Sequence, residues 1–323
     1  MSARVLVTGA VSARVLVTGA GGFVGRHLCR QLAGSGYRVR ASVRVTSPID
    51  GADEVVAVGE LGARTDWSAA LRDVDLVVHA AARVHTGGSA AAFEEVNVRG
   101  TASLAAAAVA ARVQRVVMLS TVKVNGEDSG DRAFGPDDSP RPRGHYAVSK
   151  LGAEQALERS CADSATRYAI VRAPLVYGPG VGANFLRLMR WVAHDHPLPF
   201  GAIRNRRSLV SIWNLADLVA RLLREPAPDG TWMVSDNEDL STPELIRRLS
   251  TAMGRRARLV AVPRHLLILA ALATGRRADF ERLCGSLAVD TSKTRGLLRW
   301  DPPLDVDGAL ARTAHWFAAS ATP

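Results

Sequence analysis

Short apolar runs alternate with longer segments of helical length through the first half of the chain. These runs, most of them continuous in apolar character, are RVLVTG, YRVRASV, EVVAV, VDLVVHAA, QRVVMLS and YAIVRAP. Such strands are typical of a parallel sheet that helices cover on both faces. Helices are expected over about Phe23–Ala33, Ala90–Ala111 and Tyr146–Ser160. The alternation predicts an α/β protein with a Rossmann-type doubly wound parallel sheet.

The start of the fold is ambiguous because the nine residues SARVLVTGA occur twice, at Ser2–Ala10 and at Ser12–Ala20. Only the second copy continues into further glycines and a helical segment. We therefore expect residues 12–20 to form the first strand. Residues 1–11 are then a duplicated start region or a disordered extension, and an extra edge strand is the alternative.

The pattern changes beyond about Leu175, where the chain becomes irregular and richer in proline, glycine and arginine. This change predicts a smaller C-terminal substrate-binding lobe. We expect residues 12–175, with about 208–236, to form the dinucleotide-binding domain. Residues 176–207 and 237–323 are expected to form the lobe.

The chain is basic, with a formal net charge of +10, and arginine supplies all but three of its 41 Lys and Arg residues. These residues are scattered and lack the interleaved aromatic residues of a nucleic-acid surface, so we expect no nucleic-acid partner. A positive cleft does attract anionic small molecules, which favours a phosphorylated ligand.

Signals for export, metal binding and membrane insertion are missing or weak. The N-terminus lacks a secretory pattern, and Cys29, Cys161 and Cys284 have spacings that fit neither a metal site nor an even disulfide set. We therefore expect no metal and a cytoplasmic location. The longest apolar stretch, His265–Ala273, is too short to span a bilayer, although contact with a membrane surface is an alternative for it.

A glycine-rich turn follows the first expected strand. Gly19, Gly22 and Gly25 have the spacing that lets a strand turn tightly, approach a pyrophosphate and pack against a helix. Phe23 and Val24 begin that helix, whose unpaired N–H groups favour phosphate. The turn predicts a dinucleotide-binding site.

The end of the second strand indicates which dinucleotide binds. NAD-specific folds place an acidic residue there, about 20 residues beyond the turn, to bond the ribose 2′-hydroxyl. This chain has Val43 followed by Arg44 instead. Since a guanidinium accommodates a 2′-phosphate, NADP(H) is favoured, with NAD(H) as the alternative. A second interpretation makes Arg40 and Arg44 merely solvated charges at the strand end.

The segment YAVSK places Tyr146 and Lys150 four residues apart, hence on one helix face. Thr121 ends the strand QRVVMLS, at the sheet edge where ligands bind. We expect Tyr146 to exchange a proton with a substrate oxygen, Thr121 to hold that oxygen, and the Lys150 ammonium to lower the tyrosine pKa. The alternative is a purely structural Tyr–Lys pair.

The motifs TGAGGFVG, HAAA, LSTVKVNG, YAVSK and APLVYGPG together resemble the extended short-chain dehydrogenase/reductase family. Within it they are similar to the NAD-dependent epimerases and dehydratases, close to the UDP-glucose 4-epimerases and a subgroup with UDP-4-keto-sugar 4-reductases. The similarity spans about Arg14–Trp300. It implies that Thr121, Tyr146 and Lys150 are the catalytic residues.

The resemblance also implies ligand contacts outside this triad. Six residues would contact the adenine, the phosphates and ribose, and the nicotinamide of the cofactor: Glu60 and Leu61, Ala80 and Ala81, and Pro174 and Val176. The family carries aspartate where this chain has Glu60. Asn184 and Arg207 would bind the diphosphate of the substrate, and a solvated charge is the alternative for Arg207. Asn97 matches an asparagine close to the cofactor.

These expectations favour an NAD(P)-dependent oxidoreductase acting at C4 of a UDP-linked hexose, with a 4-keto reductase ahead of a 4-epimerase. A variant acting on a lipid-linked sugar diphosphate and a non-catalytic NADP-sensing regulator are further alternatives. The resemblance implies a UDP-sugar partner, and a homodimer through the helices preceding the fifth and sixth strands is compatible with it.

Overall fold

The computed structural model describes residues 13–84, 88–224, 227–275 and 277–321. The first copy of the duplicated nonapeptide, and with it the expected extension over residues 1–11, lies outside the described residues. The first strand comes from the second copy, as the sequence predicts.

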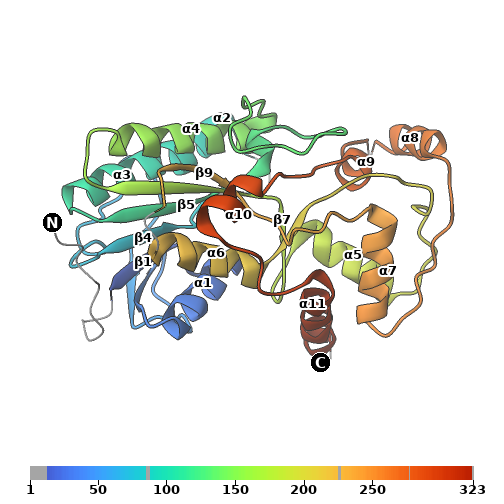
Figure 1. Cartoon of the computed structure of the whole chain (residues 1–323), viewed down its shortest axis with the longest axis horizontal. Coiled ribbons are helices and arrows are strands. Elements are labelled where there is room, and N and C mark those ends of the chain that lie inside the picture. The colour runs from blue at the N-terminus through green and yellow to red at the C-terminus, as the bar shows by residue number, and fades with distance from the viewer. Residues whose placement is uncertain (1–12, 85–87, 225–226, 276, 322–323) are drawn as a thin grey trace.

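A seven-stranded sheet, parallel throughout, forms the larger part of the molecule (Figure 1). Its order is β3-β2-β1-β4-β5-β6-β9, which is the doubly wound arrangement that the alternation predicts. The strands are β1 (Arg14–Thr18), β2 (Arg38–Val43), β3 (Glu54–Ala57), β4 (Leu76–His79), β5 (Arg115–Thr121), β6 (Arg167–Ala173) and β9 (Gly230–Met233).

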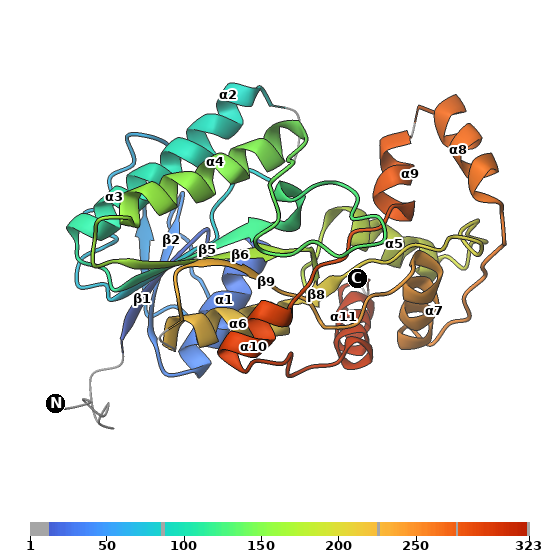
Figure 2. The same ribbon diagram turned by 45° about the horizontal axis from the view of Figure 1, so that its top comes forward.

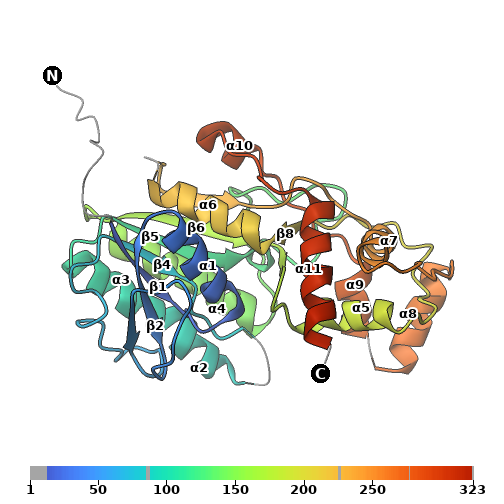
Figure 3. The same cartoon turned by 90° about the horizontal axis from the view of Figure 1, so that it is seen from below.

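Helices cover both faces of this sheet. Those on one face are α2 (Ala90–Phe93), the π-helix η1 (Glu94–Arg99), α3 (Gly100–Ala110) and α4 (Gly144–Cys161). Those on the other face are α1 (Phe23–Gly34) and α6 (Ile212–Arg224), which lie side by side in Figure 3.

The two covered faces explain why the strands read as continuous apolar runs. Successive side chains of a strand point to opposite faces. In β1, Val15 and Val17 pack into the core beneath α1 and α6, while Leu16 packs into the core beneath α3 and α4. All three are fully buried, so both faces of the strand favour apolar residues.

A smaller region follows β6 and has its own core. It contains a two-stranded parallel sheet of β7 (Leu175–Tyr177) and β8 (Leu209–Ser211). Its helices are α5 (Ala183–Ala193), α7 (Thr242–Ala252), α8 (Arg264–Ala273), α9 (Arg277–Cys284) and α11 (Val306–Ala321). Buried side chains such as Phe185, Met189 and Ile246 form a cluster separate from the sheet cores.

One segment of the expected lobe returns to the large sheet. Helix α10 (Ser292–Leu298) packs beside β9, where the Thr294 hydroxyl donates to the Met233 carbonyl at 2.7 Å. The indole of Trp300 donates to Asp217 of α6 at 2.7 Å, and Trp300 joins the core beneath α6. Residues 292–300 therefore lie against the seven-stranded sheet and α6 rather than in the smaller region.

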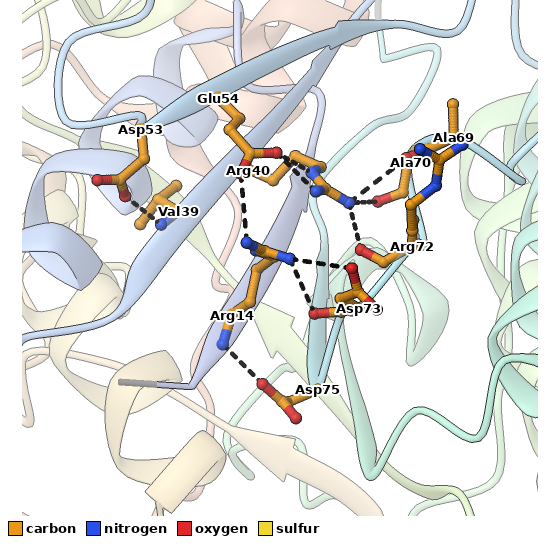
Figure 4. Close-up of polar contacts among 10 residues, drawn as sticks. All are labelled: Arg14, Val39, Arg40, Asp53, Glu54, Ala69, Ala70, Arg72, Asp73 and Asp75. Carbon is orange, nitrogen blue, oxygen red and sulfur yellow. Dashed lines mark hydrogen bonds and ion pairs between the residues drawn. The ribbon is translucent and has the colours of Figure 1, made fainter. Parts of the chain in front are cut away.

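Arg40 is a structural residue rather than a solvated charge at the strand end. Its guanidinium is buried, pairs with Glu54 at 2.6 Å, and donates to the carbonyls of Ala70 (3.1 Å) and Arg72 (2.6 Å) (Figure 4). The hydrogen bond from Arg40 lowers the pKa of the Glu54 carboxyl. Arg40 therefore ties the loop before β4 to the edge of the sheet.

Among the described residues, no helix has both the length and the apolar character needed to cross a membrane. The same part of the chain holds no group of three or more His, Cys, Asp or Glu side chains suited to a metal ion. Its three cysteines are buried free thiols.

Candidate active site

The glycine turn after β1 forms a cradle that only glycine permits. Gly19 has a φ of +67°, and a Cβ there would lie 2.7 Å from the Ala81 Cα. A Cβ at Gly25 would lie 2.1 Å from the Gly19 carbonyl oxygen, and one at Gly22 would lie 3.2 Å from it. The turn therefore brings the carboxyl ends of β1 and β4 and the start of α1 into close contact.

The start of α1 offers its N–H groups to a ligand. Gly22 is the N-cap and provides no side-chain cap, and the first turn carries no acidic residue. Phe23 and Val24, the first helical residues, are partly exposed. Uncapped N–H groups and the positive end of the helix dipole suit a pyrophosphate, so the cradle fits a dinucleotide.

Thr121 and Tyr146 meet at the carboxyl end of β5. Thr121 is the last residue of that strand, and Tyr146 lies in the first turn of α4. Burial disfavours the phenolate and raises the pKa of Tyr146 to about 12. The nearby Thr121 hydroxyl acts in the opposite direction and lowers that pKa by a smaller amount.

Lys150 lies one turn further along α4 and is fully buried. Burial lowers its pKa to about 8, against the opposing field of the Glu154 carboxylate. Its ammonium donates to the Leu119 carbonyl at 2.8 Å. Burial, which raises the pKa of Tyr146, is the largest influence on that pKa, so the lowering that we expect from the Lys150 ammonium stays a prediction.

A buried ion pair joins α4, the helix of Tyr146 and Lys150, to the sheet, and the sequence analysis did not predict it. Glu154, four residues beyond Lys150, pairs with Arg172 of β6 at 2.6 Å, and the Ser120 hydroxyl donates to the same carboxylate. Arg172 also donates to the Asn125 side chain at 3.1 Å. The spacing of Lys150 and Glu154 on one helix face was the available signal.

A chain of hydrogen bonds links the glycine turn to the catalytic helix through His79. Thr101 donates to the Asn97 carbonyl at 2.6 Å, so its oxygen accepts from His79 Nε2 at 2.9 Å. His79 Nδ1 then accepts from Thr18 at 2.7 Å, and Thr18 accepts from the Ala81 N–H at 3.2 Å. His79 is thus neutral, consistent with burial lowering its pKa to about 3.

The Asn97 side chain completes this chain. Its amide donates to Ser149 at 2.9 Å, between Tyr146 and Lys150 in sequence, and its oxygen accepts from the Arg83 N–H at 2.7 Å. Asn97 lies in the π-helix η1, a distortion that often accompanies functional sites. It therefore positions both the loop after β4 and the helix that carries the catalytic residues.

Arg44 and Glu60, predicted separately to contact the 2′-position and the adenine, form an ion pair at 3.4 Å. Their side chains are 75% and 80% exposed. Val43, the last residue of β2, pairs in register with Ala57, the last residue of β3. Arg44 and Glu60 follow these two strand ends and therefore lie beyond the same edge of the sheet. Leu61, next to Glu60, is partly exposed there.

The residues expected to line the rest of the cofactor lie at neighbouring strand ends. Ala80 and Ala81 follow β4 directly and are partly exposed beside the glycine turn. Pro174 follows β6, whose Ala173 pairs in register with Thr121. Val176 lies in β7 and is partly exposed.

The two residues expected to bind a diphosphate belong to the smaller region. Asn184 is exposed in the first turn of α5, and its side-chain oxygen accepts from Arg187 at 3.1 Å. Arg207 donates to the Gly285 carbonyl at 2.8 Å, and burial lowers its pKa. Arg207 is therefore an inward-facing group rather than a solvated surface charge.

Comparison with known proteins agrees with this geometry. The model of the NAD dependent epimerase/dehydratase family matches residues 15–234. The "UDP-glucose 4-epimerase" of Vibrio cholerae is 38% identical over 327 residues, covering 98% of this chain and 96% of that protein. This chain belongs to the NAD dependent epimerase/dehydratase family. It is an enzyme of that family, whose members use a nicotinamide dinucleotide.

Solved structures share the epimerase/dehydratase fold along nearly the whole chain. A UDP-N-acetylglucosamine 4-epimerase from Bacillus cereus has a TM-score of 0.80 at 20% identity, covering 95% of this chain and all of that one. A UDP-glucuronic acid 4-epimerase from Bacillus cereus in complex with NAD has a TM-score of 0.77 at 23% identity, covering 96% and 100%. These similarities establish the Rossmann-type sheet with its smaller C-terminal region.

Proposed function

We propose that this enzyme epimerises a UDP-linked hexose at C4, using NAD. The observation that carries the proposal is the Thr121–Tyr146 pair, one helical turn from the buried Lys150 and at the same edge of the sheet as the glycine cradle. The similarity to the Vibrio cholerae protein along the full length supports C4 epimerisation over the 4-keto reduction that the sequence favoured.

NAD held by the glycine cradle would supply the acceptor and donor of a hydride at C4. Tyr146 is the group positioned to take the proton of the C4 hydroxyl as the ketone forms, and to give it back when the ketone is reduced. Thr121 hydrogen-bonds the same oxygen and so fixes its distance from the phenol.

Lys150 serves the proton transfer by its charge. Its pKa of about 8 leaves most of the ammonium protonated at neutral pH. Contact between this ammonium and the phenol oxygen favours the phenolate. Glu154 supports the charged state of Lys150, since its field raises the pKa of that amine.

The diphosphate end of the substrate belongs to the smaller region in this proposal. Arg207 presents an inward-facing guanidinium that can bind two phosphate oxygens, and Asn184 presents an amide at the start of α5. We propose the division expected from the sequence with one exception: residues 12–175 and about 208–236 bind the dinucleotide, and 176–207 and 237–323 bind the sugar nucleotide, apart from residues 292–300, which pack against the large sheet.

The cofactor preference follows from the Arg44–Glu60 pair. Glu60 compensates the positive charge that a 2′-phosphate needs, so NADP is less favoured than Arg44 alone suggests. A carboxylate at this sheet edge also suits the ribose hydroxyls of NAD. The solved structure of the Bacillus cereus UDP-glucuronic acid 4-epimerase with NAD is consistent with this choice.

The direct test follows UDP-glucose incubated with the purified enzyme and NAD by proton NMR. Formation of the C4 epimer without net NADH accumulation is expected, with Tyr146→Phe as the inactive control. A second assay supplies NADPH and a UDP-4-keto-hexose. If the first assay yields no epimer and the second consumes both compounds, the second candidate, a 4-keto reductase, would be established instead. The lack of a carboxylate at the end of β2, where Arg44 follows Val43, favours that candidate.

A further inference from the structure

A charged pair stands next to the catalytic threonine without a role in the mechanism above. The short 3-10 helix η2 (Val122–Val124) follows Thr121 directly, and the Lys123 N–H donates to the Thr121 hydroxyl at 3.3 Å. The Lys123 ammonium contacts both carboxylate oxygens of Glu127, at 3.1 and 3.2 Å. Lys123 is one of only three lysines in the chain.

The residue that follows this pair, Asp128, lies near the contact that Arg207 makes with Gly285. Asp128, beside Glu127, places a carboxylate oxygen 3.9 Å from where a Cβ on Gly285 would lie, and Gly285 accepts the hydrogen bond of Arg207. The charges of Glu127 and Asp128 both act to raise the pKa of Arg207. The segment that carries the pair therefore begins beside the reacting hydroxyl of Thr121 and continues, at Asp128, toward Arg207.

The surrounding loop is held in place by the smaller region. The Ser129 N–H donates to the Ser286 carbonyl at 3.0 Å, and Phe134 forms a bridge with Val289. Figure 2 shows this loop, between β5 and α4, running across to the end of α9. Lys123 and Glu127 thus occupy fixed positions at the boundary between the two parts of the molecule.

The exposure of the two side chains argues against a structural role. Lys123 is 32% and Glu127 35% exposed, so both side chains are partly accessible. Ion pairs at this level of exposure contribute little to stability, about 0–1 kcal/mol. Because the fold gains little from this pair, and because Lys123 lies two residues beyond Thr121, the charged groups of the pair are available to a sugar held between Thr121 and Arg207.

We propose that Lys123 and Glu127 together recognise the hexose ring and select a neutral sugar over a uronic acid. The inference rests on the proposed function. The ammonium donates to a ring substituent and the carboxylate accepts from a hydroxyl, so a neutral hexose satisfies both. A sugar carboxylate would compete with Glu127 for Lys123 and would meet a like charge, which disfavours binding.

The test compares Glu127→Gln and Lys123→Met with the parent. The control is Asp137→Asn, which breaks a similar pair with Lys293 (3.0 Å, Lys293 also 32% exposed). For each protein, kcat/KM and the dissociation constant are measured with UDP-glucose and with UDP-glucuronate. Glu127→Gln is expected to raise the UDP-glucuronate to UDP-glucose preference about tenfold in both quantities. Lys123→Met is expected to raise KM for UDP-glucose with a smaller change in kcat.

The two proposals can fail separately. A preference that Glu127→Gln leaves unchanged, or that Asp137→Asn shifts equally, would overturn the role of the pair. A parent that binds both UDP-sugars but epimerises neither would reject the proposed function, while the ratio of dissociation constants would still decide the inference.

Discussion

The Arg44–Glu60 pair makes cofactor preference adjustable by a single charge. Both side chains are mostly exposed, at 75% and 80%, and lie 3.4 Å apart beyond the ends of β2 and β3. In dinucleotide folds this edge faces the ribose 2′-position. Glu60→Gln removes the negative charge and keeps the shape of the side chain, so Arg44 is left free to meet a 2′-phosphate.

The size of the effect follows from the exposure. At such exposed positions the dielectric constant is close to that of water, so two unit charges about 6 Å apart interact by about 0.7 kcal/mol. A 2′-phosphate carries close to two charges, which doubles the repulsion from Glu60 to about 1.4 kcal/mol, or about tenfold in affinity. Glu60→Gln should therefore tighten NADP⁺ binding about tenfold and change NAD⁺ binding little.

Arg44→Ala should do the reverse, weakening NADP⁺ binding about tenfold with little change for NAD⁺. Calorimetric titration of both cofactors measures these constants, at low salt and again at about 0.5 M salt, where screening should remove most of the difference. Asp50→Asn is the matched control, because Asp50 forms an exposed pair with Arg30 at 2.6 Å. Equal changes for NAD⁺ and NADP⁺, or a salt-independent difference, would refute the electrostatic argument.

Three further changes probe the site and its support. Gly25→Ala should abolish cofactor binding and lower the thermal midpoint, because its Cβ would lie 2.1 Å from the Gly19 oxygen, whereas Gly21→Ala meets nothing within 4 Å and should preserve both. Tyr146→Phe should reduce kcat at least about a hundredfold with cofactor affinity unchanged, since it removes only the proton carrier. In the unfolded chain His79 binds a proton below about pH 6.5, but in the folded protein burial lowers its pKa to about 3. The free energy of unfolding should therefore decrease by up to about 1.4 kcal/mol for each unit that the pH is lowered between these two values. His79→Gln should flatten this slope in thermal melts, and an unchanged slope would remove His79 as its source.

The large sheet could be predicted from the sequence because its signal is local. Val15, Leu16 and Val17 must all be apolar when helices cover both faces, and this is visible without knowing the partners. The return of α10 to the sheet leaves no such signal. It depends on contacts distant in sequence, such as the bond between Trp300 and Asp217, 83 positions apart.

The candidate site likewise contains some residues that local sequence patterns predict and some contacts that only the fold creates. Tyr146 and Lys150 share a helix face by spacing alone, and the glycine turn is a continuous motif. Arg44 and Glu60 are 16 positions apart and meet only because β2 and β3 pair with Val43 opposite Ala57. The sequence therefore suggested a free guanidinium, and the register of the sheet supplies the carboxylate that changes the expected cofactor.

The buried catalytic pair also shows what the site must do to carry out proton transfer. With the pKa of Tyr146 at about 12, ionising the phenol at pH 7 costs about 7 kcal/mol, at 1.4 kcal/mol per pH unit. An ammonium about 4 Å from the phenolate returns about 4 kcal/mol at an effective dielectric constant of 20, more than half of that cost. In this structure the ammonium of Lys150 donates to the Leu119 carbonyl. An ammonium has three N–H donors, so Lys150 can keep this backbone partner and still turn another N–H toward the phenol oxygen. The burial that sets the cost of ionising Tyr146 also makes this single charge strong enough to offset more than half of that cost.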